Sequence, residues 1–349
     1  MKITYIFGAG ASANAVPMVR ETKGYIEKTI LDFLDFYGNA DDLVARDLSN
    51  KTLLDSLLAD LRWIRLLLND YDTPDQLALD FYNQRPDDNK YPNQEFVKIK
   101  NLMAILILKA QFESAGKEGR YLAFWKRIMQ GDKYRDFELP KNLNFINWNY
   151  DSMFYESRFL SKSDCEENSL KYEEILKPFE NTLANINGTA GFLAQPGNQV
   201  RAYYEHMHLP SYYKYFPSRF PIRGDAEFNF KYELLRLHAR LQQFEYSDNT
   251  GTKNGISYAF EDDGKNKEKA LNFVKDSDFI VTIGYSFPEY NKEIDHAILG
   301  KFKGKRIYVQ DMRSEIADKI RRFFSNTEIV KHVNEVDQFY IPYEWKPEW

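Results

Sequence analysis

Residues 2 to 17 read KITYIFGAGASANAVP, and this stretch indicates the fold. The β-branched and aromatic run at 3–7 is typical of a buried strand, and Gly8 and Gly10 follow directly after it. With Ala13, these glycines fit the G-x-G-x-x-A pattern of turns in which the backbone approaches a diphosphate at the start of a helix. The pattern predicts a phosphate-binding turn. The alternative is a tight strand-to-helix turn that binds nothing.

The rest of the chain alternates between helical and strand patterns. Strand patterns recur at 143–148, 278–287 and 306–311. Strands that alternate with helices are typical of a mostly parallel sheet with helices on both faces. We therefore expect an α/β, Rossmann-like fold in a single domain over residues 1–349, with a large helical insertion at about 24–140 and a loop-rich segment at about 158–275.

Composition narrows the class of protein. The 47 basic residues are spread among 52 acidic ones, and the net charge of -5 argues against direct binding of nucleic acid. The single cysteine, Cys165, excludes an intramolecular disulfide and a cysteine-based zinc site, and it fits the cytosol. The first residues do not resemble a signal peptide, and the longest apolar run, at 102–108, is too short to cross a bilayer. We expect a cytoplasmic protein with no membrane partner.

A second motif, NWNYD at 147–151, ends the strand pattern that begins at residue 143. Asn149 and Asp151 should therefore lie at the carboxyl edge of the sheet, where open α/β sheets bind ligands. An amide and a carboxylate at that edge can hold sugar hydroxyls, although both residues could instead cap the helix that starts near Ser152. Helix rather than a second strand follows the glycine turn, which argues against an ordinary hydride-transfer enzyme.

Three motifs together resemble those of sirtuins. GAGASANAVPMVR resembles the sirtuin signature and places Pro17 and Arg20 in it, FINWNYD resembles the Asn-x-Asp motif in its bacterial form, and VTIGYSFPEYNKEIDHAI resembles the Gly-x-Ser motif. The motifs occur in the family's order and span residues 3 to about 311. With a helical insertion and no zinc cysteines, the chain looks like the bacterial sirtuin-like proteins of anti-phage defence. Those proteins cleave NAD, often together with an ATPase or a sensor protein.

The resemblance implies that NAD is the substrate, that no metal is needed and that the chain forms a homo-oligomer. It also implies that the nicotinamide ribose lies against Asn149 and Asp151, where Asn149 orients water or ribose hydroxyls and Asp151 orders that arrangement. Loss of nicotinamide resembles glycoside hydrolysis, because positive charge develops on the ribose. The implied NAD-binding residues are Gly8, Ala9, Gly10, Ala11, Ser12, Pro17, Arg20, Gly284, Ser286 and Asp311.

The chain departs from the family at one position. Asn187-Gly188 stands where the family has a His-Gly pair, and an amide cannot take up a proton near neutral pH. Asn187 can still hydrogen-bond a ribose hydroxyl during hydrolysis, or a histidine from elsewhere (His206, His208 or His238) can take its place. Alternatively, the protein is a non-catalytic subunit of a defence complex that binds NAD or ADP-ribose. A protein deacylase is a further reading, which the missing zinc cysteines and histidine argue against.

Overall fold

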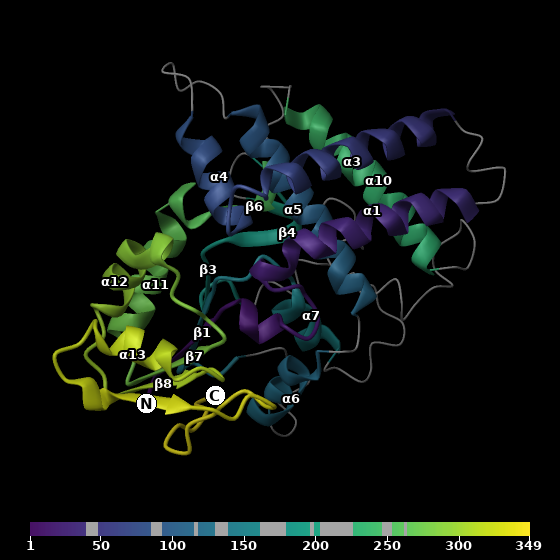
Figure 1. Cartoon of the computed structure of the whole chain (residues 1–349). Coiled ribbons are helices and arrows are strands. Elements are labelled where there is room, and N and C mark those ends of the chain that lie inside the picture. The colour runs from purple at the N-terminus through teal and green to yellow at the C-terminus, as the bar shows by residue number, and fades with distance from the viewer. Residues whose placement is uncertain are drawn as a thin grey trace. The chain divides into compact units, whose positions relative to one another are not determined.

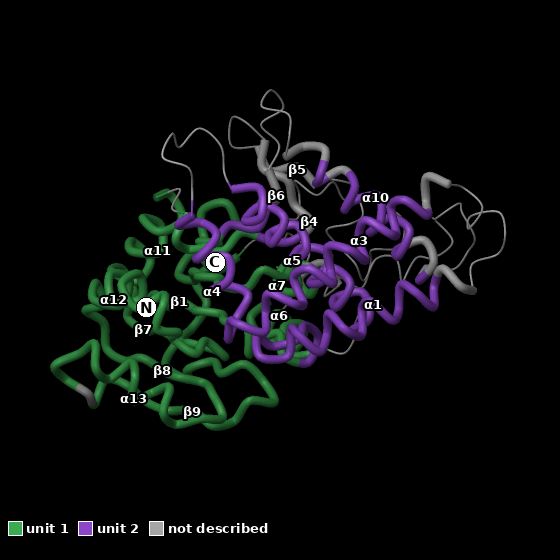
Figure 2. The backbone as a smooth tube through the Cα atoms, turned by 45° about the horizontal axis from the view of Figure 1, so that its top comes forward, with its two compact units in different colours: residues 1–13, 117–188, 258–349 green, residues 14–116, 189–257 purple. Residues whose placement is uncertain are grey.

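The chain divides into two compact units. Unit 1 comprises residues 1–13, 117–188 and 258–349, and unit 2 comprises residues 14–116 and 189–257 (Figure 2). The computed structural model describes residues 1–39, 48–84, 93–114, 118–129, 139–160, 179–195, 199–202, 226–245, 253–261 and 264–349. That these units form one domain stays a prediction.

Unit 1 is built on a six-stranded sheet in which every neighbouring pair is parallel. Its spatial order is β3 (Leu183–Asn185), β2 (Leu143–Asn147), β1 (Ile3–Phe7), β7 (Phe279–Ile283), β8 (Arg306–Gln310) and β9 (Val330–Val333). Counted along the chain, this is the 3-2-1-4-5-6 order of dinucleotide-binding folds, so the predicted α/β, Rossmann-like fold is confirmed.

The strand order reverses between β1 and β7, and such a switch point is where open α/β sheets bind ligands. Phe7 lies opposite Asn147 on β2 and Ile283 on β7, so the three strands end level with one another. Residues that follow these strands therefore emerge together at one edge of the sheet.

Alternation along β1 explains how helices cover both faces of the sheet. Tyr5 and Phe7 point to one face, where the ring of Tyr5 meets that of Phe124 edge-on at 4.9 Å. Ile6 points to the other face, in a core that it shares with Val274 and other apolar residues. The helices are α6 (Gly119–Ile128) and α7 (Met153–Leu160) on the first face, and α11 (Lys265–Lys275), α12 (Lys292–Leu299) and α13 (Glu315–Arg321) on the second (Figure 1).

Unit 2 is mainly helical. In its described residues, the α-helices are α1 (Thr22–Asn39), α3 (Leu48–Leu67), α4 (Pro74–Asn83), α5 (Gln94–Glu113) and α10 (Ala226–Glu245). A three-stranded sheet orders β5 (Gln199–Ala202), β4 (Gly188–Gln195) and β6 (Lys253–Ile256). Helix α10, which packs on α3 and α5, lies in the segment expected to be rich in loops, so the sequence reading missed a 20-residue helix there.

Short 3-10 helices occur in both units, at η1 (Ala9–Ser12), η2 (Val19–Glu21), η6 (Ala259–Glu261), η7 (Glu289–Asn291) and η8 (Thr327–Ile329). Within the described ranges, no helix combines the length and apolar character that a membrane span requires.

Candidate functional site

Two glycine turns meet where β1 and β7 end. The N–H of Gly8 donates to the carbonyl of Ile283 at 3.0 Å, and the N–H of Gly10 donates to that of Gly284 at 2.9 Å. A Cβ on Gly10 would lie 2.8 Å from the Cα of Gly284, which itself has a φ of +60°. A side chain at either position would strike backbone atoms, so the approach of the turns requires glycine whether or not a ligand binds.

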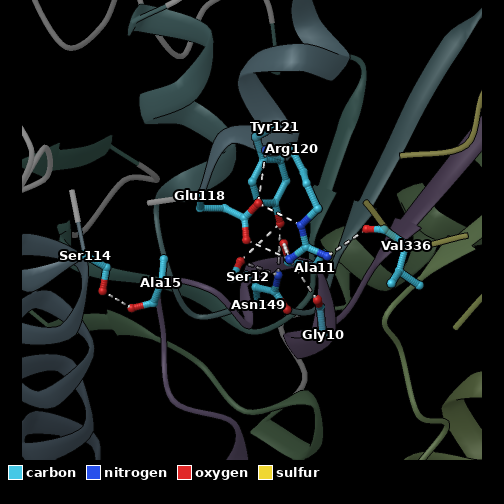
Figure 3. Close-up of polar contacts among 10 residues, drawn as sticks. All are labelled: Gly10, Ala11, Ser12, Ala15, Ser114, Glu118, Arg120, Tyr121, Asn149 and Val336. Atoms are coloured by element: carbon cyan, nitrogen blue, oxygen red, sulfur yellow. Dashed lines mark hydrogen bonds and ion pairs between the residues drawn. The ribbon is translucent and has the colours of Figure 1, made fainter. Parts of the chain in front are cut away.

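A buried ion pair holds the turn after β1. The guanidinium of Arg120 donates to the carbonyls of Gly10 and Ala11 at 3.3 and 3.0 Å, and its Nη2 lies 2.7 Å from Oε2 of Glu118 (Figure 3). The Glu118 side chain is fully buried and also accepts from the N–H of Arg120 at the start of α6. The guanidinium thus satisfies two carbonyls of η1, while Glu118 neutralises its charge.

Beside this pair lies a group of buried polar side chains that we call the Ser12 cluster: Ser12, Tyr121, Asn149 and Asp151. The hydroxyls of Ser12 and Tyr121 are 3.2 Å apart. Nδ2 of Asn149 donates to Oγ of Ser12 at 3.2 Å and to Oη of Tyr121 at 3.3 Å (Figure 3). The cluster joins η1, α6 and the segment after β2, so it brings predicted site residues from two motifs together.

Asn147, the last residue of β2, fixes the backbone of Asn149. Its Oδ1 accepts from the N–H of Asn149 at 3.2 Å, and its Nδ2 donates to the carbonyl of Asn149 at 3.3 Å. Oδ1 of Asn149 is buried and has no hydrogen-bond partner among the described residues. If the amide were turned over, the same end would still lack a partner. One end of a buried amide therefore has no hydrogen-bond partner within the described ranges.

Asp151 caps α7, because its Oδ1 accepts from the N–H of Met153 at 3.0 Å. The capping alternative therefore describes Asp151, whereas the side chain of Asn149 binds Ser12 and Tyr121 instead. Burial raises the pKa of Asp151 to about 6, which hydrogen bonds from Ser12 and Met153 oppose and the charge of Glu118 favours. The carboxyl group therefore changes its charge close to neutral pH.

Asn187 follows β3, and its side chain bonds to the backbone of the residue that precedes Asn149. Its Nδ2 donates to the carbonyl of Trp148 at 2.7 Å, and this bond fixes the orientation of the amide. Oδ1 of Asn187 is buried and, within the described ranges, has no hydrogen-bond partner. The structure thus provides a second unpaired amide oxygen, next to the residue that precedes Asn149.

The structure describes one of the three histidines that could replace the missing family histidine. His238 is buried in unit 2, where its Nε2 lies 3.0 Å from Oδ2 of Asp60. His206 and His208 lie outside the described residues. No group of three or more His, Cys, Asp or Glu side chains that could hold a metal ion occurs in the part of the chain that the structure describes.

The turn after β7 contacts the segment after β2. The ring of Tyr285 stacks on that of Trp148 at 4.9 Å, and its hydroxyl donates to the carboxylate of Asp295. The carbonyl of Ser286 accepts from Nζ of Lys319 at 2.9 Å. Gly284 and Ser286 are thus held in a turn that packs on the residue before Asn149.

The remaining predicted binding residues are Asp311, Pro17 and Arg20. Asp311 directly follows β8, and its Oδ1 accepts from the N–H of Arg313 at 2.9 Å. Pro17 and Arg20 belong to unit 2. The Arg20 side chain is exposed, with its Nε 3.9 Å from Oε1 of Glu21.

Sequence reasoning missed Glu118, Arg120 and Tyr121, because 121–130 was read only as an apolar helical pattern. A weak signal existed: two opposite charges, Glu118 and Arg120, stand two residues apart at the start of this helix. Nothing in the pattern indicates that Glu118 is buried and Arg120 partly buried.

Comparison with known proteins leaves the family open. The chain matches no protein-family model and no curated protein. The resemblance to sirtuin-like proteins therefore rests on the three sequence motifs and stays a prediction.

Proposed function

We propose that the protein binds NAD at the switch point of unit 1 and hydrolyses it to nicotinamide and ADP-ribose, as a sirtuin-like defence effector. The observation that carries this proposal is the buried amide of Asn149, one end of which has no partner. Buried polar groups in folded proteins are nearly always hydrogen-bonded, so an unpaired one needs an explanation. A ligand bound at the carboxyl edge of the sheet, with hydroxyl groups that donate to this oxygen, would explain why the amide has no other partner.

A ribose fits the groups that the edge offers. Oδ1 of Asn149 and Oδ1 of Asn187 are both acceptors without partners among the described residues, and ribose hydroxyls are donors. Neither oxygen is reached by solvent in this structure, so a bound ribose must displace the atoms that cover them. The diphosphate would then lie along the turn from Gly8 to Ser12.

In hydrolysis, the oxygen of a water molecule bonds to the ribose carbon that carries nicotinamide. The carbon–nitrogen bond breaks, its electron pair stays with nicotinamide, which leaves as a neutral molecule, and the water proton goes to solvent. Because the ribose becomes positively charged in the transition state, a nearby ionised Asp151 stabilises it, and Asn149 positions the water or the hydroxyls. Since burial raises the pKa of Asp151 to about 6, activity should rise with pH through that value.

A binding subunit is the second candidate function, and Asn187 favours it. Its amide cannot take up a proton, and Nδ2 is already bonded to the carbonyl of Trp148. In this alternative the same edge holds NAD or ADP-ribose without cleaving it. A homo-oligomer and a partner ATPase or sensor protein belong to both candidates, because the family resemblance implies them.

Nicotinamide release from NAD, measured by chromatography, tests the proposal. Wild type should release nicotinamide, and Asn149→Ala should be at least about 100-fold slower with a nearly unchanged melting temperature. Asn326→Ala is the matched control, since Asn326 is an exposed asparagine of unit 1, and it should release nicotinamide at the wild-type rate.

Other outcomes separate the two candidates. Binding of NAD in a calorimeter without release of nicotinamide supports the binding subunit. Asn187→His should raise turnover if Asn187 is a weakened catalytic position. A large loss of stability in Asn149→Ala would mean that this residue is chiefly structural.

A further inference from the structure

Trp148 stands between Asn147 and Asn149, and its backbone also contacts Asn187. The carbonyl of Trp148 accepts from Nδ2 of Asn187 at 2.7 Å, and its N–H donates to the carbonyl of Phe7 at 2.9 Å. The backbone of Trp148 is thus bonded both to the end of β1 and to the residue after β3. Its position determines where the amide of Asn187 can lie.

The carbonyl of Trp148 allows only one orientation of the Asn187 amide. If the amide were turned over, its oxygen would take the place of Nδ2, 2.7 Å from that carbonyl. Two acceptors would then oppose each other at a buried side chain, which is costly. The orientation in the structure leaves Oδ1 of Asn187 as an acceptor that has no partner among the described residues. The place of the Trp148 carbonyl therefore decides which end of Asn187 can meet a ligand hydroxyl.

The side chain of Trp148 is held by Tyr285, which comes from the turn after β7. The two rings are nearly parallel, with an interplanar angle of 15° and centroids 4.9 Å apart. Both side chains are buried. The ring of Tyr285 therefore limits how far the indole of Trp148, and the backbone that carries it, can move.

Two residues that follow the turn fix the hydroxyl of Tyr285. It donates to the carboxyl group of Asp295 on α12, with Oη 3.0 and 3.1 Å from the two carboxyl oxygens, and it accepts from Nδ2 of Asn291 at 3.1 Å. Among the described residues, Tyr285 is the one hydrogen-bond donor to this buried carboxyl group. Burial raises the pKa of Asp295 to about 8, so the group is costly to keep in the core. Its bond to Tyr285 gives it a role there.

We propose that Tyr285 is a positioning residue that, by holding Trp148, fixes the amide of Asn187 with Oδ1 toward the ligand. The inference deepens the proposed function and rests on it for the identity of the ligand. The ring stack and the hydrogen bonds themselves do not depend on that function. Tyr285 thus links the turn after β7 to the residue that follows β3.

Hydrogen exchange of the Asn187 side chain tests this link without a ligand. The protein is labelled with 15N at the asparagine side-chain amides, and Asn187→Ala assigns the signals of Asn187. Tyr285→Leu removes the ring stack and should speed exchange of the Nδ2 hydrogens at least about 10-fold, because their bond to the Trp148 carbonyl opens more often.

Phe302→Leu is the matched control for this measurement. Phe302 is a buried ring of the same apolar core as Tyr285, and its ring contacts Phe324 rather than Trp148. This variant should leave the exchange of Asn187 within about 2-fold of wild type. Unchanged exchange in Tyr285→Leu, or equal acceleration in Tyr285→Leu and Phe302→Leu, would overturn the proposal.

Tyr285→Phe is a milder variant for the case that Tyr285→Leu does not fold. It keeps the ring stack and removes only the hydrogen bonds to Asp295 and Asn291. Exchange of the Asn187 amide should then be about 3-fold faster than in wild type, since the ring has lost its anchor. If Tyr285→Leu does not fold, an unchanged rate in Tyr285→Phe would overturn the proposal.

A double-mutant cycle tests whether Tyr285 acts on the ligand through Asn187. Calorimetry measures the affinity for ADP-ribose of wild type, Tyr285→Leu, Asn187→Ala and the double variant. Tyr285→Leu should weaken binding about 5-fold in wild type and less than about 2-fold in the Asn187→Ala background, because the group that it positions is gone. Losses that multiply in the double variant would contradict the proposal. If wild type does not bind ADP-ribose, the proposed function fails, whereas the exchange of Asn187 still decides the positioning role.

Discussion

Unit 1 and unit 2 each bury a polar cluster, and the two clusters differ in how their charges are compensated. In unit 2, Lys109 on α5 is almost fully buried, yet its Nζ lies 2.6 Å from Oδ2 of Asp32 and also bonds to Glu113. The ring of Tyr25 is 5.4 Å from the same nitrogen. We call these four residues the Lys109 cluster. The buried ammonium group of Lys109 is thus paired with two carboxylates and a tyrosine ring.

The Ser12 cluster of unit 1 shows the opposite arrangement. No cation in the described part of the chain forms an ion pair with Asp151, and Oδ1 of Asn149 has no partner there either. Burial raises the pKa of both Asp32 and Asp151, but Lys109 outweighs it at Asp32, whose pKa is lowered, whereas that of Asp151 rises to about 6. Full compensation indicates a structural role, and groups left unpaired indicate a site for a ligand.

The largest expected effect on stability comes from Lys109→Met. Removing the cation leaves Asp32 and Glu113 without their central partner, which should lower the free energy of unfolding by about 3 kcal/mol. Lys28→Met is the control, since exposed Lys28 lies 3.2 Å from the same Glu113 and should cost less than about 0.5 kcal/mol. Urea unfolding measures both variants. Equal losses in the two would mean that the Lys109 cluster does not hold unit 2 together.

Asp151→Asn should instead raise the free energy of unfolding above pH 6. The pKa of Asp151 is about 6 in the folded protein against 3.8 as its ordinary value, so between these values the folded state binds more protons than the unfolded state. Stability should therefore fall as pH rises from about 4 to about 6. Asparagine removes that fall, so at pH 8 the variant should be up to about 3 kcal/mol more stable than wild type and yet inactive.

Asp276→Asn is the control for this prediction, because Asp276 is an exposed carboxylate of unit 1. Chemical denaturation between pH 4 and pH 8 measures all three proteins. An Asp151→Asn variant that is clearly less stable than wild type at pH 8 would show that the carboxylate is compensated after all.

Asn187→Ala should have the smallest effect on stability. The variant loses one hydrogen bond, from Nδ2 to the carbonyl of Trp148, but it also loses a buried oxygen without a partner among the described residues. The net change should stay below about 1 kcal/mol, while ADP-ribose should bind about 10-fold more weakly. Thermal unfolding and calorimetry measure these quantities. A large loss of stability with unchanged binding would make Asn187 a structural residue.

The sequence predicted the part of the fold that local pattern controls. The apolar run at 3–7, the two glycines after it and the later strand patterns led to the parallel sheet, because buried strands and tight turns depend on nearby residues. Asn149 was also placed correctly at the end of a strand, since that position follows from the strand itself.

Long-range packing explains what the sequence reading missed. Phe230, Leu234, Leu237 and Leu241 recur at helical spacing in α10, but the aromatic and proline-rich residues before them obscured the pattern. The contact of Gly10 with Gly284, and the contact of Arg120 with the turn after β1, join residues far apart in the chain. No local pattern contains such pairs, and the side-chain partners of Asn149, which are Ser12 and Tyr121, are likewise distant from it in the chain.

Calorimetric titration of NAD into wild type, Asn149→Ala and Lys109→Met tests the central claim most directly. If the Ser12 cluster is the ligand site and the Lys109 cluster is structural, wild type and folded Lys109→Met should bind NAD with similar affinity, and Asn149→Ala should bind it at least about 10-fold more weakly. Equal affinity in all three proteins, or no binding by wild type, would contradict the account.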